Sequence, residues 1–444
     1  MRDMTDLLGL KNTSPAANAW RAFKDSLTHK PPAYDMNGLV TENWFTWFRK
    51  NMASLWSPPY APYPYYSYPE ANNGIFKMNK PAGEPIVIAL LADWASDTAE
   101  SRQIAAMAGI QDYSIHLGDT YYVGNSNEMA ENFDTDQDGT WPYGKLGSFA
   151  IPGNHEMYSG GTSYFTELLP YMGLYTSGQE APEQVQQAGF FCLENENWRI
   201  IALDTGYNSL TGMLGITPNI ALELRPEQQD WLTNVVCPNG DKRGIILLSH
   251  HQCWSAFEQE FPNPAGFISS LFSPARDILW LWGHEHWFAI YGPLQLPNGA
   301  NVFARCIGNS GMPVELNDTN GNVHAPKSGY NTDPANRNLV LYDKRLRTMV
   351  DGDVPLGHNG YALLTLNGPD AWISYYDDTS STRPILEETW TCNPATGALK
   401  GTGITDHTAV PGADPEKILS LFGDRWSDAI TPSANPQKAP FSNP

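Results

Sequence analysis

Short runs of apolar residues, each closed by a polar residue, recur along the middle of the chain. The first run, Ile86–Ala92, stops at Asp93, and the second, Tyr113–Leu117, stops at Gly118 and Asp119. Continuous apolar runs of this length, without alternation with polar residues, predict strands that are buried on both faces. We therefore expect a buried sheet whose strands end in polar residues.

The same arrangement continues through the rest of the chain. Further predicted strands are Phe149–Ile151, Phe190–Leu193, Arg199–Leu203, Gly244–Ser249, Ile278–Trp282, Val302–Ile307, Tyr361–Leu366 and Trp372–Tyr376. Predicted helices are Thr98–Ile110 and Pro226–Val236. The turn sequence ENEN separates Phe190–Leu193 from Arg199–Leu203 and predicts a hairpin. Strands that alternate with helices in this way predict an α/β core.

The two ends of the chain have a different pattern. Residues 15–28 predict an amphipathic helix, and residues 57–70 read SPPYAPYPYYSYPE. A segment so rich in Pro and Tyr predicts either an extended strap packed on its own domain or a polyproline-like ligand for a partner. We expect residues 1–84 to be an N-terminal extension packing on the core, 85–384 to be the main domain, and 385–444 to be a C-terminal extension.

Charge and composition narrow the function. The net charge of −21, from 48 acids and 27 bases, repels polyanions, so duplex nucleic acid and anionic membranes are excluded as partners. No stretch approaches the roughly 20 apolar residues of a membrane span. The five cysteines are scattered without a CxxC pair, and the N-terminus lacks a secretory pattern. These features predict a cytoplasmic protein and leave a small phosphate ester as a possible substrate.

The polar residues that close the predicted strands are of the types that bind metals. Open α/β sheets place their sites at the carboxyl ends of strands. Taken singly, each residue has a structural explanation, such as a turn-forming Asp or a core histidine. The joint order, D-x(25)-D-x(2)-Y followed by GNHE, HH and GHEH, predicts that the side chains converge on metal. The candidate ligands are Asp93, Asp119, Tyr122, Asn154, the pair His250-His251, His284 and His286.

This set of residue types suits a pair of cations. Two adjacent cations repel each other, so a shared carboxylate is needed between them, and Asp119 is the candidate bridge. Imidazole and carboxylate ligands suit Zn, Mn and Fe, and Asn154 adds a neutral oxygen. Such a pair lowers the pKa of bound water to about 7 and supplies hydroxide for attack on a phosphate ester. His155 is expected to donate a proton or stabilise charge, the alternative being a turn histidine capped by Glu156.

The blocks LADW, GDTYY, GNHE, SHHQCWS and GHEH, in this order, resemble the five signature blocks of the calcineurin-like metallophosphoesterases. Within that superfamily the closer likeness is to purple acid phosphatases. Trp94-Ala95 follows Asp93 where many members carry a histidine, and Tyr122 matches the tyrosine of the GDxxY block. The resemblance implies a four-layer α/β/β/α sandwich of two mixed sheets flanked by helices, with the site at the strand ends.

The resemblance also implies two sets of ligands. One set, around ferric iron, is Asp93, Asp119, Tyr122 and His286; the other, around Zn, Mn or Fe(II), is Asp119, Asn154, His250 and His284. His250 is preferred to His251 because the first histidine of that block is the usual ligand, which leaves His251 to face the substrate or pack nearby. Gln259 stands where purple acid phosphatases carry a second substrate-side histidine. This departure favours a phosphodiester substrate or a more neutral pH optimum.

Two functions remain open at this point. The first is a dinuclear-metal phosphoesterase that hydrolyses phosphate mono- or diesters by attack of a metal-bound hydroxide. The second is a non-catalytic metal-binding scaffold whose Pro/Tyr strap recognises a partner. An intact ligand set accompanied by His155 favours the enzyme.

Two other motifs lie outside this scheme. Asp134–Gly139 reads DTDQDG, like the start of an EF-hand loop, but Lys145 stands where the twelfth position requires a bidentate Glu. We expect a polar turn at the rim of the pocket, with a calcium site as the alternative. Asp204-Thr205 follows a predicted strand that carries no ligand block, and we interpret it as structural.

Overall fold

The computed structural model describes the central part of the chain. The described residues are 68, 73–81, 83–175, 182–211, 217–219, 221–272, 276–296, 300–316, 327, 339–350 and 354–406. The expected helix at 15–28 and most of the Pro/Tyr segment lie outside them. Tyr68, from that segment, donates a hydrogen bond to the Phe190 carbonyl (2.6 Å) and sets its ring against the edges of Phe76 and Phe190. At this residue the segment packs on its own domain.

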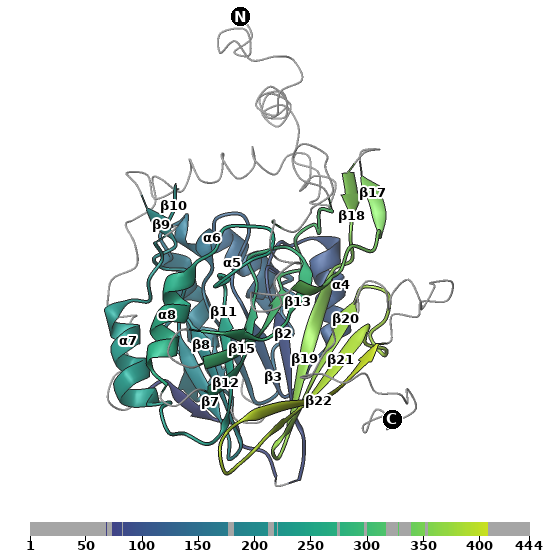
Figure 1. Cartoon of the computed structure of the whole chain (residues 1–444). Coiled ribbons are helices and arrows are strands. Elements are labelled where there is room, and N and C mark those ends of the chain that lie inside the picture. Colours follow the sequence, from purple (N-terminus) through teal and green to yellow (C-terminus); the bar gives the residue numbers. More distant parts are fainter. Residues whose placement is uncertain are drawn as a thin grey trace, which may run out of the picture.

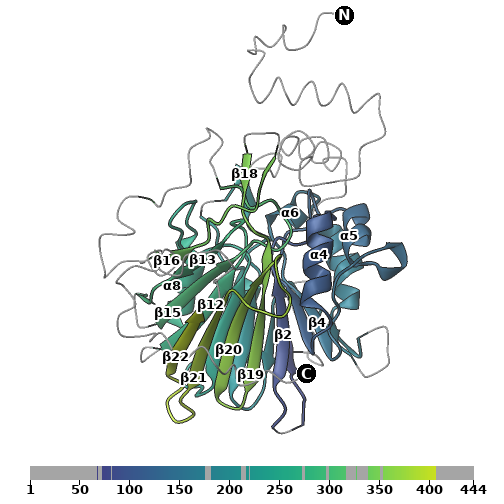
Figure 2. The same ribbon diagram turned by 90° about the vertical axis from the view of Figure 1, so that its right-hand side faces the viewer.

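The described residues form two sheets of nine strands each (Figures 1 and 2). The first has the order β1 (Ile75–Lys77), β7 (Phe191–Glu194), β8 (Trp198–Leu203), β11 (Gly244–Ser249), β12 (Arg276–Trp282), β15 (Ala300–Ile307), β13 (Phe288–Tyr291) and β16 (Leu339–Tyr342), with β14 (Leu294–Gln295) beside β15. The second has the order β22 (Leu399–Asp406), β21 (Leu386–Cys392), β20 (Asp370–Asp377), β19 (Gly360–Asn367), β2 (Ile86–Leu91), β3 (Tyr113–His116), β4 (Gly147–Ala150), β5 (Gly173–Leu174) and β6 (Gln184–Val185). Both sheets are mixed: β8, β11, β12 and β15 run parallel in one, and β2, β3 and β4 in the other.

The helices are short, and those with buried apolar side chains pack on the outer faces of the sheets. They are α4 (Ala99–Ala108), α5 (Ser126–Phe133), α6 (Asn154–Met157), α7 (Pro226–Trp231) and α8 (Pro262–Ser270), with single turns η2 (Thr135–Gln137), η3 (Tyr164–Leu168), η4 (Leu169–Tyr171) and η5 (Leu232–Val236). Small hairpins are formed by β9 (Leu210–Thr211) with β10 (Thr217–Pro218) and by β17 (Thr348–Val350) with β18 (Val354–Leu356). Figures 1 and 2 show α7 and α8 beside the first sheet and α4 beside the second. The expected four-layer sandwich is confirmed.

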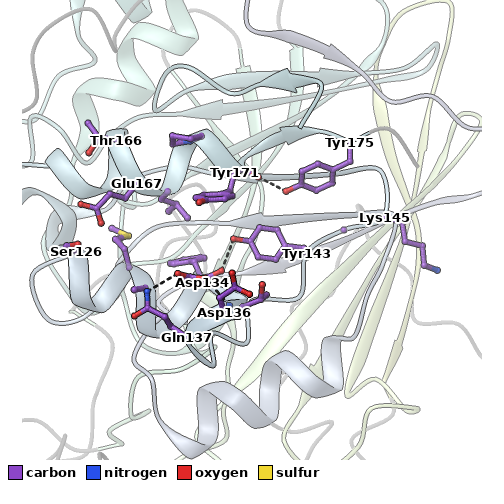
Figure 3. Close-up of a pocket in the computed structure, with 17 residues that line it drawn as sticks. Ser126, Asp134, Asp136, Gln137, Tyr143, Lys145, Thr166, Glu167, Tyr171 and Tyr175 are labelled. Carbon is purple, nitrogen blue, oxygen red and sulfur yellow. Dashed lines mark hydrogen bonds between the residues drawn. The ribbon is translucent and has the colours of Figure 1, made fainter. Parts of the chain in front are cut away.

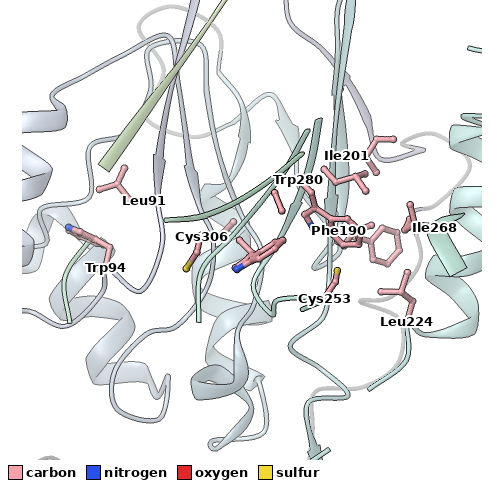
Figure 4. Close-up of a cluster of buried hydrophobic side chains, with 14 of the residues drawn as sticks. Leu91, Trp94, Phe190, Ile201, Leu224, Cys253, Ile268, Trp280 and Cys306 are labelled. Carbon is pink, nitrogen blue, oxygen red and sulfur yellow. The ribbon is translucent and has the colours of Figure 1, made fainter. Parts of the chain in front are cut away.

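The apolar runs are continuous because both faces of their strands are buried. In β2, Ile88 and Leu90 point into the core between the two sheets, whereas Ala89 and Leu91 point outward towards the helices. The central strands of the first sheet alternate in the same way, and Figure 4 shows Ile201 and Trp280 of that sheet near Ile268 of α8. A run that is apolar at every position is what two packed faces require.

The second sheet extends beyond the boundary expected at residue 384. β21 and β22 continue it, and at the other end of the sequence β1 joins the first sheet from within the expected N-terminal extension. In β21 the inward position 388 is a glutamate, which hides the apolar alternation. Glu388 is fully buried and forms a bidentate ion pair with Arg305 of β15, both contacts being 2.7 Å. The inward-facing charge is therefore satisfied across the interface between the sheets.

No helix among the described residues is long and apolar enough to cross a membrane.

Candidate metal centre

The polar residues that end the central strands meet at one edge of the sandwich. Asp93 follows β2, Asp119 lies beyond β3, and Asn154 begins α6 after β4. From the other sheet, His250 follows β11 directly, and His284 comes shortly after β12. Because these strands run parallel within each sheet, their carboxyl ends share an edge, and the face-to-face packing brings both sets together.

Glycines next to the ligands allow the loops to approach. A Cβ on Gly118, whose φ is +96°, would lie 2.7 Å from both the Gly153 nitrogen and the His250 Nδ1. A Cβ on Gly153 would collide with the Asp119 carboxylate. Neither position can carry a side chain without displacing a candidate ligand.

Three candidate ligands hold a left-handed backbone conformation that non-glycine residues seldom adopt. The φ angles are 56° at Asp93, 71° at Asp119 and 68° at His284. Such conformations persist where the surroundings enforce them, and they gather at functional sites. Their coincidence with the expected ligands is independent of the motif comparison.

The two oxygens of the Asp119 carboxylate face different groups of side chains. Oδ1 lies 3.3 Å from His250 Nε2, and Oδ2 lies 3.1 Å from the Tyr121 hydroxyl. Oδ1 also accepts a hydrogen bond from the His155 backbone N–H at 2.9 Å. Burial acts to raise the pKa of Asp119, but His250 and the neighbouring histidines outweigh it and hold the pKa well below the usual range. Asp119 is therefore an ionised carboxylate shared between two groups.

The first group is centred on His250. Its Nε2 lies 3.3 Å from Asn154 Oδ1 and 3.2 Å from His284 Nδ1, while its Nδ1 donates to the Leu117 carbonyl at 2.9 Å. That backbone contact directs Nε2 into the group, as a metal-binding histidine requires. Burial lowers the pKa of His250, yet the Asp119 carboxylate overrides this and raises it to about 9, so the group favours a positive charge at this point.

The second group is centred on a tyrosine hydroxyl. Tyr121 Oη lies 2.8 Å from Asp93 Oδ1 and 2.9 Å from His286 Nε2, in addition to its contact with Asp119. Burial, reinforced by the Asp119 charge, raises the pKa of Asp93 well above its usual range. Two buried carboxyls and a phenol can all be ionised only beside a compensating cation. The mixed nitrogen and oxygen donors of both groups fit Fe, Zn or Mn.

The tyrosine in this group is Tyr121, whereas the sequence motif predicted Tyr122. Tyr122 packs in a small apolar cluster with Val123 and Met312, and its carbonyl accepts a hydrogen bond from His155 Nδ1 at 2.6 Å. The spacing of three residues assumes a fixed path after Asp119. Here the backbone turns with positive φ at Gly118 and Asp119, and it is the Tyr121 side chain that points to Asp93. Two adjacent tyrosines in the sequence indicated that either could face the site, but the spacing from Asp119 could not decide between Tyr121 and Tyr122.

His155 lies at the mouth of the site. Its Nδ1 is held by the Tyr122 carbonyl, and its Nε2 lies 3.7 Å from Asp119 Oδ2. The side chain is 16% exposed, compared with 2% for Asp119, so the ring stands between the ligands and solvent. The ring centroid is 4.3 Å from that of Tyr121. This position suits a group that meets a bound substrate.

The two expected substrate-side residues have different positions. The His251 ring is buried, with its centroid 4.8 Å from that of His250 and 4.5 Å from that of His284. Gln259 is exposed and donates its side-chain amide to the neighbouring Glu260 carbonyl. The structure brings His251 to the candidate ligands and turns Gln259 towards its own loop.

Two residues that the sequence analysis did not place at the site support it. Thr205, interpreted as structural, lies against His251, because β8 is the parallel neighbour of β11 and the two strands end together. Glu156 accepts hydrogen bonds from the Asp119 N–H (3.2 Å) and the Gly153 N–H (2.8 Å) through one oxygen. Burial and the Asp119 charge raise the pKa of Glu156 to about 7. The position of Thr205 at the end of a predicted strand could have indicated from the sequence that it lies near the site.

The DTDQDG segment lines a separate cavity of about 800 Å³ beside α5 and η4. Figure 3 shows Asp134 and Asp136 next to Tyr143 in this cavity. Both oxygens of Asp134 are used within the turn, accepting from the Asp136 N–H and the Gln137 side chain, each at 2.9 Å. The segment is therefore a polar turn at a cavity rim.

Residues 86–288 match the model of the family described as calcineurin-like phosphoesterase. Similar solved structures include a purple acid phosphatase from yellow lupin (Lupinus luteus) seeds, with 12% identity and a TM-score of 0.42 over 67% of this chain and 52% of that one. PhoD is 12% identical, with a TM-score of 0.45 over 78% of each chain. GAP50, the anchor in the inner membrane complex of Plasmodium, is 10% identical, with a TM-score of 0.38 over 80% of this chain and 99% of that one.

The chain spans about half the length of the lupin enzyme, 52%. No curated protein matches it in sequence. The matched interval, residues 86–288, includes all the candidate ligands from Asp93 to His286.

Proposed function

Since residues 86–288 match the family model of calcineurin-like phosphoesterases, we propose that this chain hydrolyses phosphate esters with two metal ions at the strand ends. The observation that carries the proposal is the Asp119 carboxylate, whose Oδ1 faces His250 and whose Oδ2 faces Tyr121. One carboxylate between two donor groups is the arrangement that a dinuclear centre needs.

The residues divide into two proposed ligand sets. Asp93, Asp119, Tyr121 and His286 would hold one ion, and Asp119, Asn154, His250 and His284 the other. The phenol and two carboxylates suit ferric iron, and the set richer in imidazole suits Zn, Mn or Fe(II). Cations held by these residues would supply hydroxide at neutral pH and would neutralise the charge of a phosphoryl group. This local positive charge reconciles a net charge of −21 with an anionic substrate.

His155 is the proposed proton donor to the leaving oxygen. The Tyr122 carbonyl holds Nδ1, so Nε2 is the nitrogen that faces the centre. In its protonated form Nε2–H can donate to an oxygen of a bound ester. The ring is held by a backbone contact on one side and by Tyr121 on the other, which limits its rotation.

The substrate is proposed to be a small phosphate ester, with diesters favoured over monoesters. Gln259 carries no titratable proton, and its exposed side-chain amide donates to the neighbouring Glu260 carbonyl, so it does not replace the second histidine of purple acid phosphatases. A diester presents one fewer negative charge, and its hydrolysis makes less demand on a second proton donor.

The test is turnover of p-nitrophenyl phosphate and bis-p-nitrophenyl phosphate by the full chain, before and after removal of metal by a chelator. We expect hydrolysis that chelation abolishes and that added Fe, Zn or Mn restores, with the diester cleaved faster. If neither ester is cleaved with any of these metals supplied, the phosphoesterase proposal fails and a metal-binding scaffold replaces it. Faster cleavage of the monoester would overturn only the substrate preference.

A further inference from the structure

His251 and Thr205 form a closed pair of contacts beside the candidate ligands. The His251 backbone N–H donates to Thr205 Oγ1 at 3.0 Å, and Thr205 Oγ1 lies 3.1 Å from His251 Nδ1. Each residue is 3% exposed. Both side chains are thus held in a single arrangement by one another.

The single hydrogen of the Thr205 hydroxyl decides which ring nitrogen of His251 is protonated. A threonine hydroxyl offers one hydrogen and two lone pairs. The His251 backbone N–H uses one lone pair, and among the described residues the hydroxyl hydrogen has only His251 Nδ1 as an acceptor. If Nδ1 carried the proton instead, the buried hydroxyl would be left with an unused hydrogen. The arrangement therefore selects the neutral imidazole with its proton on Nε2.

The surroundings of the ring agree with a neutral donor. The His251 ring lies between Phe261, at a centroid distance of 5.0 Å, and His284, at 4.5 Å. A ring nitrogen of His251 lies within 4.8 Å of nitrogens of His250 and His284, close enough for the three to be considered one metal-binding group. A metal ligand, however, needs a lone pair on Nε2, which this tautomer does not have.

We propose that Thr205 holds His251 as the Nε2–H tautomer, and that this N–H donates a hydrogen bond to a phosphoryl oxygen bound beside His250 and His284. The inference rests on the proposed function and adds a second substrate-side donor to it. His251 would contact the substrate, whereas Thr205 is a positioning residue that acts through the ring. A fixed neutral donor stabilises negative charge that develops on oxygen without requiring a proton transfer.

The variants are chosen to separate the effect of the Thr205 hydroxyl from the effect of the size of the side chain. Thr205→Val keeps the shape and removes the hydroxyl, and Thr205→Ser keeps the hydroxyl. His251→Gln places an amide N–H near the position of Nε2, and His251→Phe removes every donor. Thermal unfolding of each variant, monitored by circular dichroism, shows which of them fold.

Three measurements are made on the metal-loaded full chain. A long-range 1H–15N correlation spectrum of histidine-labelled protein reports the tautomer of His251. Titration with inorganic phosphate reports binding of an oxyanion, and elemental analysis reports metal content. Turnover of bis-p-nitrophenyl phosphate gives kcat and KM.

We expect the Nε2–H tautomer in the wild type and in Thr205→Ser, and a mixture of tautomers in Thr205→Val. Thr205→Val should bind phosphate roughly 10- to 100-fold more weakly and lose kcat by a similar factor, with metal content unchanged. Thr205→Ser should recover most of this loss. His251→Gln should bind phosphate more tightly and have a higher kcat than His251→Phe.

A wild-type spectrum with the proton on Nδ1 would overturn the proposal, as would loss of metal in both His251 variants, since that result makes His251 a ligand. Equal phosphate affinity in Thr205→Val and the wild type would also overturn it. If the wild type turns over neither ester, the proposed function fails, while the tautomer and phosphate measurements still decide the pairing of Thr205 with His251.

Discussion

At the scale of single residues, the centre depends on side chains that contact more than one neighbour. Asp119 contacts His250 through one oxygen and Tyr121 through the other. The surrounding histidines hold its pKa low, and it is almost fully buried. Its removal therefore affects both proposed ions, whereas the loss of Asn154 or His286 would affect one.

The first prediction follows from this sharing. Asp119→Asn keeps the size of the side chain and removes the charge, so we expect both ions to be lost and turnover with them. Elemental analysis after gel filtration measures the loss. Asp136→Asn is the matched control, because Asp136 is an exposed carboxylate at the separate cavity. Full metal content in Asp119→Asn would refute the bridging role.

The second prediction distinguishes the two adjacent tyrosines. A phenolate bound to ferric iron absorbs visible light, so iron-loaded protein should be coloured. Tyr121→Phe should abolish the band because the Tyr121 hydroxyl lies among the proposed ligands, and Tyr122→Phe should retain it. Visible absorption spectra of the two variants provide the measurement. The opposite result would restore Tyr122 as the ligand, and a colourless wild type with two bound metals would reject the iron–tyrosine centre.

The third prediction concerns His155. Its Nε2 faces Asp119 from 3.7 Å, but the ring is at the mouth of the site and outside the two donor groups. His155→Ala should keep its metals and lose roughly 100- to 10,000-fold in kcat, the usual contribution of a proton donor. Metal content and steady-state kinetics are measured on the same sample. Undiminished kcat would remove His155 from the mechanism.

At the scale of elements, the loops that follow the strands, and not the strands themselves, position the candidate site. β3 leads to Gly118, where the chain turns with φ +96° and passes against the Gly153 backbone. β4 leads to Gly153 and then to α6, and Glu156 in that turn holds both loops through their backbone N–H groups. The two loops therefore form one unit with a common anchor.

The fourth prediction tests this close approach. Gly118→Ala adds a Cβ 2.7 Å from His250 Nδ1 and the Gly153 nitrogen, so we expect weaker metal binding and a lower free energy of unfolding, by about 2–3 kcal/mol. Gly240→Ala is the matched control, since Gly240 also has a positive φ (+78°) but no atom within 4 Å of the added Cβ. Chemical denaturation of both variants measures the difference. Equal destabilisation would mean that the backbone angle alone matters.

At the scale of the whole molecule, the candidate ligands meet because two sheets pack face to face. The two candidate carboxylates and Asn154 come from the loops of one sheet, and His250, His284 and His286 from the loops of the other. Arg305 of β15 and Glu388 of β21 link the sheets through their buried ion pair, to which the Tyr375 hydroxyl and the Trp390 ring N–H also donate. The Arg305–Glu388 ion pair therefore fixes the position of β21 relative to β15 of the other sheet.

The fifth prediction concerns this pair. Glu388→Gln leaves a buried guanidinium without its counter-charge, so the free energy of unfolding should fall by about 3–5 kcal/mol. Glu227→Gln is the control, because the Arg225–Glu227 contact is 3.5 Å long and partly exposed, and such pairs contribute about 0–1 kcal/mol. Urea denaturation compares the two. A small effect at Glu388 would show that packing, without the charge pair, holds the sheets together.

The sequence by itself determined the central strands, the edge at which they end, and most of the residues gathered there. The predicted run Ile86–Ala92 became β2, Ile86–Leu91, and the expected hairpin became β7 and β8. These features are local, because a strand buried on both faces must be apolar throughout and its first polar residue marks its end. They can therefore be predicted without knowing which residues distant in sequence contact them.

The tertiary structure alone decided the rest. It placed the Tyr121 hydroxyl against Asp93, left the Gln259 side chain exposed, set Thr205 against His251, and extended the second sheet through β21. Three of these outcomes depend on a group far away in sequence: Tyr121 on His286, Thr205 on His251, and Glu388 on Arg305, 83 residues apart. A buried polar side chain is oriented by whatever satisfies its charge or hydrogen bond, and that partner is known only when the sheets have packed.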